Sequence, residues 1–121
     1  MILYNEVLDL TYDEVREKFP KVESANALEK VICLENGNDI TSFSNDSAIM
    51  IWFDLGTNKP MIIAERVRRK PFVKLQINRV LKQARREMQD YSVTVGISNN
   101  KKGYDILVMK RELRERVDEN Y

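Results

Sequence analysis

From Arg66 to Asp90 the sequence reads RVRRKPFVKLQINRVLKQARREMQD. At about 100° per residue, a helix over residues 72–89 gathers its apolar side chains into one narrow stripe. The stripe consists of Val73, Ile77, Val80, Leu81, Ala84 and Met88. We therefore predict a long amphipathic helix packed on a core. Phe72 and Leu75 lie off the stripe, so each is expected either to touch a neighbouring element or to be an exposed contact.

One flank of this predicted helix carries only positive charge. Measured from Ile77, its basic side chains spread over roughly 60° to 200°, with no acidic residue among them. They are Lys74, Arg79, Lys82, Arg85 and Arg86. Further basic residues precede the helix or occupy a predicted hairpin tip, namely Arg66, Arg68, Arg69, Lys70, Lys101 and Lys102. If these cations share one face, they can neutralise phosphates and release counterions, which predicts nucleic-acid binding that weakens with salt.

An ordinary solvated surface is the alternative interpretation of these cations, because exposed helices often carry lysine and arginine. The charge is nevertheless divided unevenly along the chain. Residues 1–60 contain 11 acidic against 5 basic residues, a balance of −6, and residues 61–121 contain 8 against 15, a balance of +7. Such polarity favours a nucleic acid or an acidic protein surface as partner. The two halves could also face each other within the fold or across a homodimer.

The length and composition fit one globular domain. A chain of 121 residues can bury one core, and we predict a single domain over residues 1–121. No apolar run is long enough to span a membrane, and the first residues lack the order of a signal peptide, so we expect a cytoplasmic protein without membrane contact. One cysteine, Cys33, and no histidine leave neither an internal disulfide nor the usual zinc ligands, and we expect no metal and no cofactor.

The N-terminal part is predicted to contain a well-marked helix. The apolar residues from Ile2 to Leu10 favour a short strand or a docking segment. The sequence Thr11-Tyr12-Asp13-Glu14 then matches a capping box, in which the threonine hydroxyl and the glutamate carboxylate each accept a backbone N–H of the other residue. A helix from Tyr12 to Phe19 follows, and Pro20 ends it.

Residues 24–37 fit two different structures. In a helix, Ser24 would be the cap and Asn36-Gly37 would end the segment. In a hairpin, residues 29–35 and 39–43 would be strands on either side of the Asn-Gly turn. We favour the helix, which gives a helix–turn–helix layout. Its carboxylates would meet phosphates, so a purely structural pair of helices is favoured over a DNA-reading unit.

The rest of the chain predicts two hairpins and a last helix. Residues 47–55 and 61–67 read as one pair of strands, and residues 91–98 and 104–109 as a second pair joined by a basic turn. Residues 110–120 form a charged helical pattern. We therefore predict an α+β fold, with an antiparallel sheet of about four or more strands, the long helix packed on one face and a helical N-terminal segment.

The pattern favours a non-catalytic nucleic-acid-binding or regulatory protein, working as a homodimer. The alternative is a protein-binding inhibitor or adaptor of phage or mobile-element type, which would engage a host protein through its acidic N-terminal half. Its candidate contacts are Glu6, Asp9, Asp13, Glu14 and Glu17.

A metal-dependent nuclease is the third hypothesis. It would use Asp54 and Glu65 on paired strands to hold a divalent metal. Val67, however, stands where a lysine often completes such a site. The sequence contains no glycine-rich phosphate loop and no serine or cysteine with a histidine base. We assign no catalytic residue.

Overall fold

A computed structural model of the chain describes residues 4–19, 31–35, 38–39, 48–98 and 101–113. Within these residues the fold is α+β, as predicted. The helices are α1 (Tyr4–Val7), α2 (Tyr12–Lys18) and α3 (Val73–Glu87). The strands are β1 (Val31–Glu35), β2 (Asn38–Asp39), β3 (Ala48–Phe53), β4 (Pro60–Arg68), β5 (Tyr91–Ile97) and β6 (Gly103–Lys110). The predicted helix from Tyr12, both predicted hairpins and the long helix are therefore confirmed within one or two residues.

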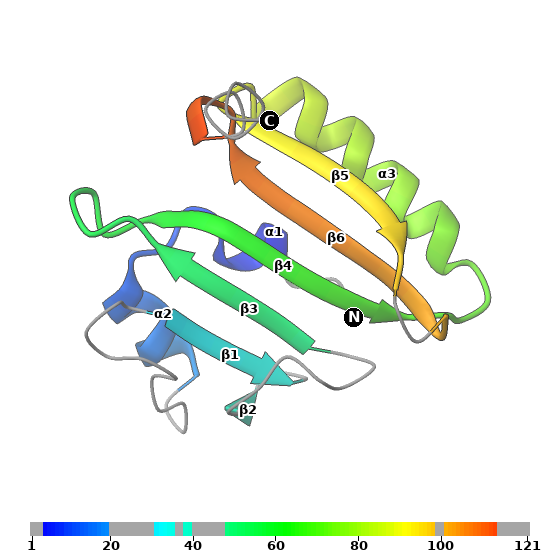
Figure 1. The fold of residues 1–121 in the computed structure, drawn as a ribbon, viewed down its shortest axis with the longest axis horizontal. Coiled ribbons are helices and arrows are strands. Elements are labelled where there is room, and N and C mark those ends of the chain that lie inside the picture. Colours follow the sequence, from blue (N-terminus) through cyan, green and yellow to red (C-terminus); the bar gives the residue numbers. More distant parts are fainter. Residues whose placement is uncertain (1–3, 20–30, 36–37, 40–47, 99–100, 114–121) are drawn as a thin grey trace.

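The described strands form one sheet of six in the order β2-β1-β3-β4-β6-β5, and every neighbouring pair is antiparallel. Strands β3 and β4 form a hairpin, and α3 then connects β4 to β5. Because β6 pairs with both β4 and β5, those two strands run in the same direction with β6 between them. Figure 1 shows α3, which connects β4 to β5, running alongside β5 and β6.

One face of the sheet carries the core, because alternate strand residues point to the same side. The strands contribute Ile32, Leu34, Ile49, Ile51, Phe53, Ile63, Val67, Ile106 and Val108 to a single buried cluster. The helices add Tyr4 and Val7 from α1, Tyr12 and Val15 from α2, and Val73 and Ile77 from α3. All three helices therefore cover the same face, and the predicted stripe of the long helix is the part that is buried.

In the N-terminal half, one prediction is wrong and another is decided between its two alternatives. Tyr4–Val7 is a docking segment rather than a strand: it forms a helical turn, held by a hydrogen bond from the Tyr4 N–H to the buried Glu65 carboxylate (3.0 Å). Val31–Glu35 is a strand rather than part of a helix, so the helix–turn–helix layout is not formed. This segment pairs with β3, and Ile32, Cys33 and Leu34 are fully buried, which a strand covered on both faces explains.

Other predictions fall partly outside the described residues. Of residues 24–37, only the part from Val31 to Glu35 is described, and of the last predicted helix only the first turn at residues 111–113. The single-domain prediction is not tested by these ranges. In the described part of the chain, no helix is both long and apolar enough to cross a membrane.

Candidate nucleic-acid interface

Five of the predicted basic residues meet at one end of the sheet. Arg68, the last residue of β4, pairs with Gly103 at the start of β6. Beyond this pair, the Arg69 N–H donates to the Lys102 carbonyl oxygen (2.8 Å), and the Arg69 guanidinium lies 5.9 Å from the centre of the Tyr104 ring. These contacts join the β4–α3 connection to the β5–β6 turn. We call the resulting group the basic end, comprising Arg68, Arg69, Lys70, Lys101 and Lys102, all of them exposed.

A glycine makes this junction possible. A Cβ atom on Gly103 would overlap the Val67 carbonyl oxygen, with the Val67 carbonyl carbon at 2.9 Å. Only a residue without a side chain therefore lets β6 begin directly against the end of β4. Lys101, in the turn before it, has a left-handed backbone with φ of 59°. The local chain geometry thus presents Lys101 and Lys102 beside the residues that lead into α3.

Arg66, a further predicted site residue, has different surroundings from the basic end. Its guanidinium forms a two-pronged contact with the Asp105 carboxylate, at 2.9 Å from Nε to Oδ1 and 3.3 Å from Nη2 to Oδ2. The Arg66 side chain is only 12% exposed. The two residues are cross-strand partners on β4 and β6, so the pairing of these strands brings the charges together. The Asp105 carboxylate therefore offsets the charge of Arg66, and we do not count Arg66 in the basic end.

The remaining predicted cations follow the outer side of α3. Lys74, Arg79, Lys82, Arg85 and Arg86 are all exposed, and we call them the basic flank. Val73, Ile77 and Ala84 face the core, so the flank points away from the sheet. The acidic residue of α3, Glu87, accepts a hydrogen bond from the Gln83 side chain (3.2 Å) on the opposite side of the helix. Because α3 begins three residues after Lys70, the basic flank continues directly from the basic end.

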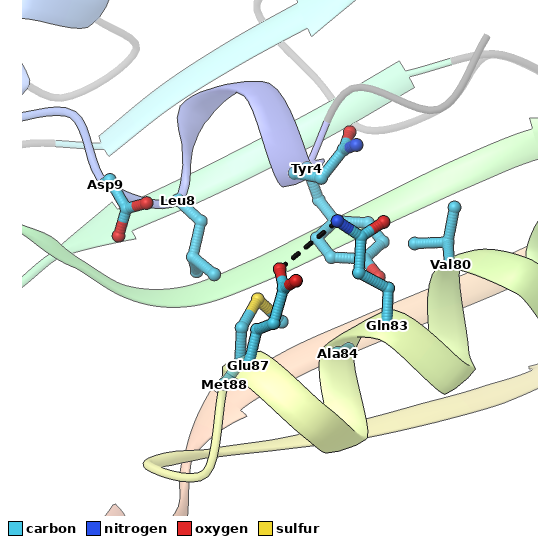
Figure 2. Close-up of a pocket in the computed structure, with 9 residues that line it drawn as sticks. Tyr4, Leu8, Asp9, Val80, Gln83, Ala84, Glu87 and Met88 are labelled. Atoms are coloured by element: carbon cyan, nitrogen blue, oxygen red, sulfur yellow. Dashed lines mark hydrogen bonds between the residues drawn. The ribbon is translucent and has the colours of Figure 1, made fainter.

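A separate cavity of about 210 Å³ lies between α1 and α3. Figure 2 shows Tyr4 and Leu8 from the N-terminal part facing Val80, Gln83 and Met88. Asp9 and Glu87 also line it, so the side chains that carry charge at neutral pH are carboxylates, opposite in sign to the basic flank. The volume is below the roughly 300 Å³ at which small-molecule sites begin. We interpret this cavity as a packing gap between the N-terminal segment and α3.

The acidic residues of the rival protein-binding hypothesis are partly used within the fold. Glu14 and Thr11 form the predicted capping box, with 3.1 Å from the Thr11 N–H to the carboxylate and 3.2 Å from the Glu14 N–H to the hydroxyl. Glu6 pairs with Lys18 at 3.6 Å. Asp13 and Glu17 are exposed on α2, and Asp9 lines the cavity beside α3. Two of the five carboxylates, those of Glu6 and Glu14, therefore already have partners within the fold.

The two carboxylates of the nuclease hypothesis have separate structural roles. Asp54 accepts the Gly56 N–H (2.8 Å) in the turn after β3, and the N–H groups of Gly56 and Thr57 hold its pKa below the ordinary value, with a further contribution from Lys110. Glu65 is buried, 2% exposed, in the core-facing row of β4. Among the described residues, no group of three potential ligands is placed to hold a metal.

Of two features of the surface, the sequence indicated one in part and the other not at all. Phe72 and Leu75, which lie off the helical stripe, are 75% and 55% exposed, so the expected alternative of exposed contacts is the one observed. A hollow of about 510 Å³ between Val67 at the end of β4 and Val80 in α3 had no sequence signal, because it depends on how the helix leaves the sheet.

Comparison with protein-family models, with curated proteins and with solved structures found no match to this chain.

Proposed function

We propose that this protein binds nucleic acid without catalysing a reaction, and that it does so through the basic end and the basic flank. The observation that carries the proposal is the hydrogen bond from Arg69 to Lys102, which joins two separate basic segments into one surface. Ten exposed lysines and arginines belong to the two groups together. Phosphates spaced along a strand can then be neutralised by several cations at once, with release of counterions.

The electrostatics of α3 support the same proposal. The helix has no acidic residue in its first turn and no side-chain cap at its N-terminus. The positive end of its dipole therefore adds to the charge of Lys70 and Lys74 instead of being offset by a carboxylate. A solvated helix face would ordinarily mix both signs of charge.

We also propose that the protein acts as a homodimer in which β5 pairs with β5 of a second copy. Among the described residues, nothing pairs with the outer edge of this seven-residue strand. The strand contains no charged residue and no proline, although natural edge strands usually carry such residues to prevent pairing. A strand without charge can pair with its own copy without repulsion. Val95 and Ile97 on this edge strand are 36% and 65% exposed.

Charge reversal tests the nucleic-acid proposal. We expect the triple variant Arg79→Glu, Lys82→Glu and Arg86→Glu to keep the fold and to lose retention on heparin and binding to DNA at low salt. The matched control reverses Arg16, Lys18 and Lys59, three exposed cations of α2 and the β3–β4 turn, and changes the net charge equally. We expect it to bind more strongly than the first variant, because these cations lie on neither basic group.

A salt series separates the proposal from non-specific attraction. Binding through several phosphates gives a log–log slope of about −0.7 per contact for single strands and −0.9 for duplex, so the wild type should have a steep slope that the first triple variant reduces. Equal loss of binding in both triple variants would mean that only net charge matters, and the assignment of the surface would then be abandoned.

A further inference from the structure

The residue directly before α3 presents an aromatic ring to solvent in a strained backbone conformation. Phe72 has φ of 66° and ψ of 0°, in the left-handed region, and its side chain is 75% exposed. A bulky residue rarely adopts this conformation. The ring is not part of the core cluster. Backbone strain that is not offset by burial of the side chain is typically found at binding sites, where it holds a group in place.

The neighbours of Phe72 fix its position. The Val73 N–H donates to the Lys70 carbonyl oxygen (3.2 Å), and the Gln76 N–H donates to the Phe72 carbonyl oxygen (3.1 Å). Val73 itself is buried, and Pro71 has a restricted φ on the other side. The backbone that carries the ring is therefore set before any ligand arrives, which reduces the ordering cost of binding.

A hollow of about 510 Å³ lies beside the backbone at Phe72, since its chain neighbours Pro71 and Val73 both line it, although the Phe72 ring itself does not. Val67, Val73 and Val80 form its apolar part, whereas Lys70, Gln76 and Arg79 supply polar and basic groups. Its size is within the range of sites for small organic groups. An apolar surface for a flat ring, with cations beside it, matches the chemistry of a nucleotide.

We propose that this site binds an unpaired nucleotide of a single-stranded nucleic acid, whose base stacks on Phe72 next to the hollow while adjacent phosphates contact Lys70, Lys74 and Arg79. The inference rests on the nucleic-acid binding proposed above and deepens it. Bases in a duplex are already stacked on both sides, so they offer no free face to an aromatic side chain, whereas single strands do. Basic surroundings favour this anionic ligand over an apolar protein segment.

The test measures the affinity of labelled 12-nucleotide oligomers by fluorescence anisotropy, using oligo-dT, oligo-U and a DNA duplex of the same length. We expect Phe72→Ala to weaken single-strand binding about tenfold or more while duplex binding changes less than about twofold. Phe72→Tyr should restore the single-strand affinity, because it keeps a ring. Leu75→Ala, which shortens the other exposed apolar residue of the first turns of α3, is the matched control and should leave both affinities unchanged.

A stacking signal makes the result specific. An oligo-dT carrying one 2-aminopurine should change its fluorescence on binding the wild type, and this change should be lost with Phe72→Ala. The dT and U arms report whether DNA or RNA is preferred. If Phe72→Ala affects single strand and duplex equally, or neither, the stacking site is wrong although nucleic-acid binding stands. If the wild type binds none of the three oligomers, the proposed function fails together with this inference.

Discussion

The conformation of Phe72 can be tested through stability alone. Glycine adopts a φ of 66° without the steric cost that a side chain incurs, and little burial is lost, because Phe72 is 75% exposed. We expect Phe72→Gly to raise the free energy of unfolding by roughly 0.5–1 kcal/mol, measured by urea denaturation. Leu75→Gly is the control, since it places glycine inside a regular helix and should lower stability by about 1 kcal/mol.

A stabilised Phe72→Gly variant that no longer stacks on single-stranded oligomers would mean that the protein gives up stability for binding at this residue. A destabilised one would contradict the strain argument.

The buried hydroxyl of Tyr4 leads us to expect that the protein becomes less stable in alkaline solution. This hydroxyl has no hydrogen-bond partner among the described residues. Burial, with a smaller contribution from the Glu65 carboxylate, raises the pKa of Tyr4 from 10.0 to about 12. As the pH rises, this tyrosine ionises in the unfolded chain before it does so in the folded protein, which favours unfolding. The free energy of unfolding should therefore decrease by about 2–3 kcal/mol between about pH 10 and 12.

The variant Tyr4→Phe removes both the unpaired hydroxyl and its titration. We expect its free energy of unfolding at pH 7 to equal that of the wild type or to exceed it by up to about 1 kcal/mol. Its stability should also decline less than that of the wild type from pH 10 to 12. The measurement is chemical denaturation of both proteins across this range, and parallel declines would show that another group controls the alkaline transition.

At the level of elements, the contact between β4 and β6 positions the basic end. Alanine at Gly103 would overlap the Val67 carbonyl oxygen, so the start of β6 must move away from β4. We expect Gly103→Ala to destabilise the protein by about 2–3 kcal/mol and to weaken oligonucleotide binding, because Lys101 and Lys102 move with the strand. Gly96→Ala on β5 is the control, since its Cβ meets nothing within 4 Å.

Sequence periodicity predicted the elements whose pattern is long or bounded by clear turns. The helix α3, the β3–β4 hairpin and the β5–β6 hairpin are all of this kind. The strand β1 was predicted only as the less favoured alternative, because a short apolar run fits a buried strand and a helix equally well, and its pairing with β3 decides between them. Contacts between residues far apart in the sequence also escaped the prediction of the site. Asp105, which pairs with Arg66, is 39 positions away, and local spacing cannot reveal such a partner.

At the level of the whole molecule, the geometry of β5 makes its outer edge available for pairing. The Ser98 N–H donates to the Gly103 carbonyl oxygen, and the Asp90 carbonyl oxygen accepts the Arg111 N–H, so even-numbered residues of this strand face β6. The backbone groups of Val93, Val95 and Ile97 must then point outward. A twofold axis through Thr94 would pair the full strand with its copy and would place both α3 helices on the same face of a continuous sheet.

If copies pair through β5 as proposed, Val95→Pro should abolish dimerisation and leave the fold of the monomer intact. Proline removes an N–H that points away from β6, so the ladder within the subunit keeps its hydrogen bonds. Sedimentation equilibrium should give twice the 14.2 kDa chain mass for the wild type and a single chain mass for the variant. Thr94→Pro is the contrasting change, because it removes an N–H that faces β6 and should lower the stability of the monomer itself. A wild type that remains monomeric at high concentration, or a Val95→Pro variant that remains dimeric, would exclude β5 as the contact between copies.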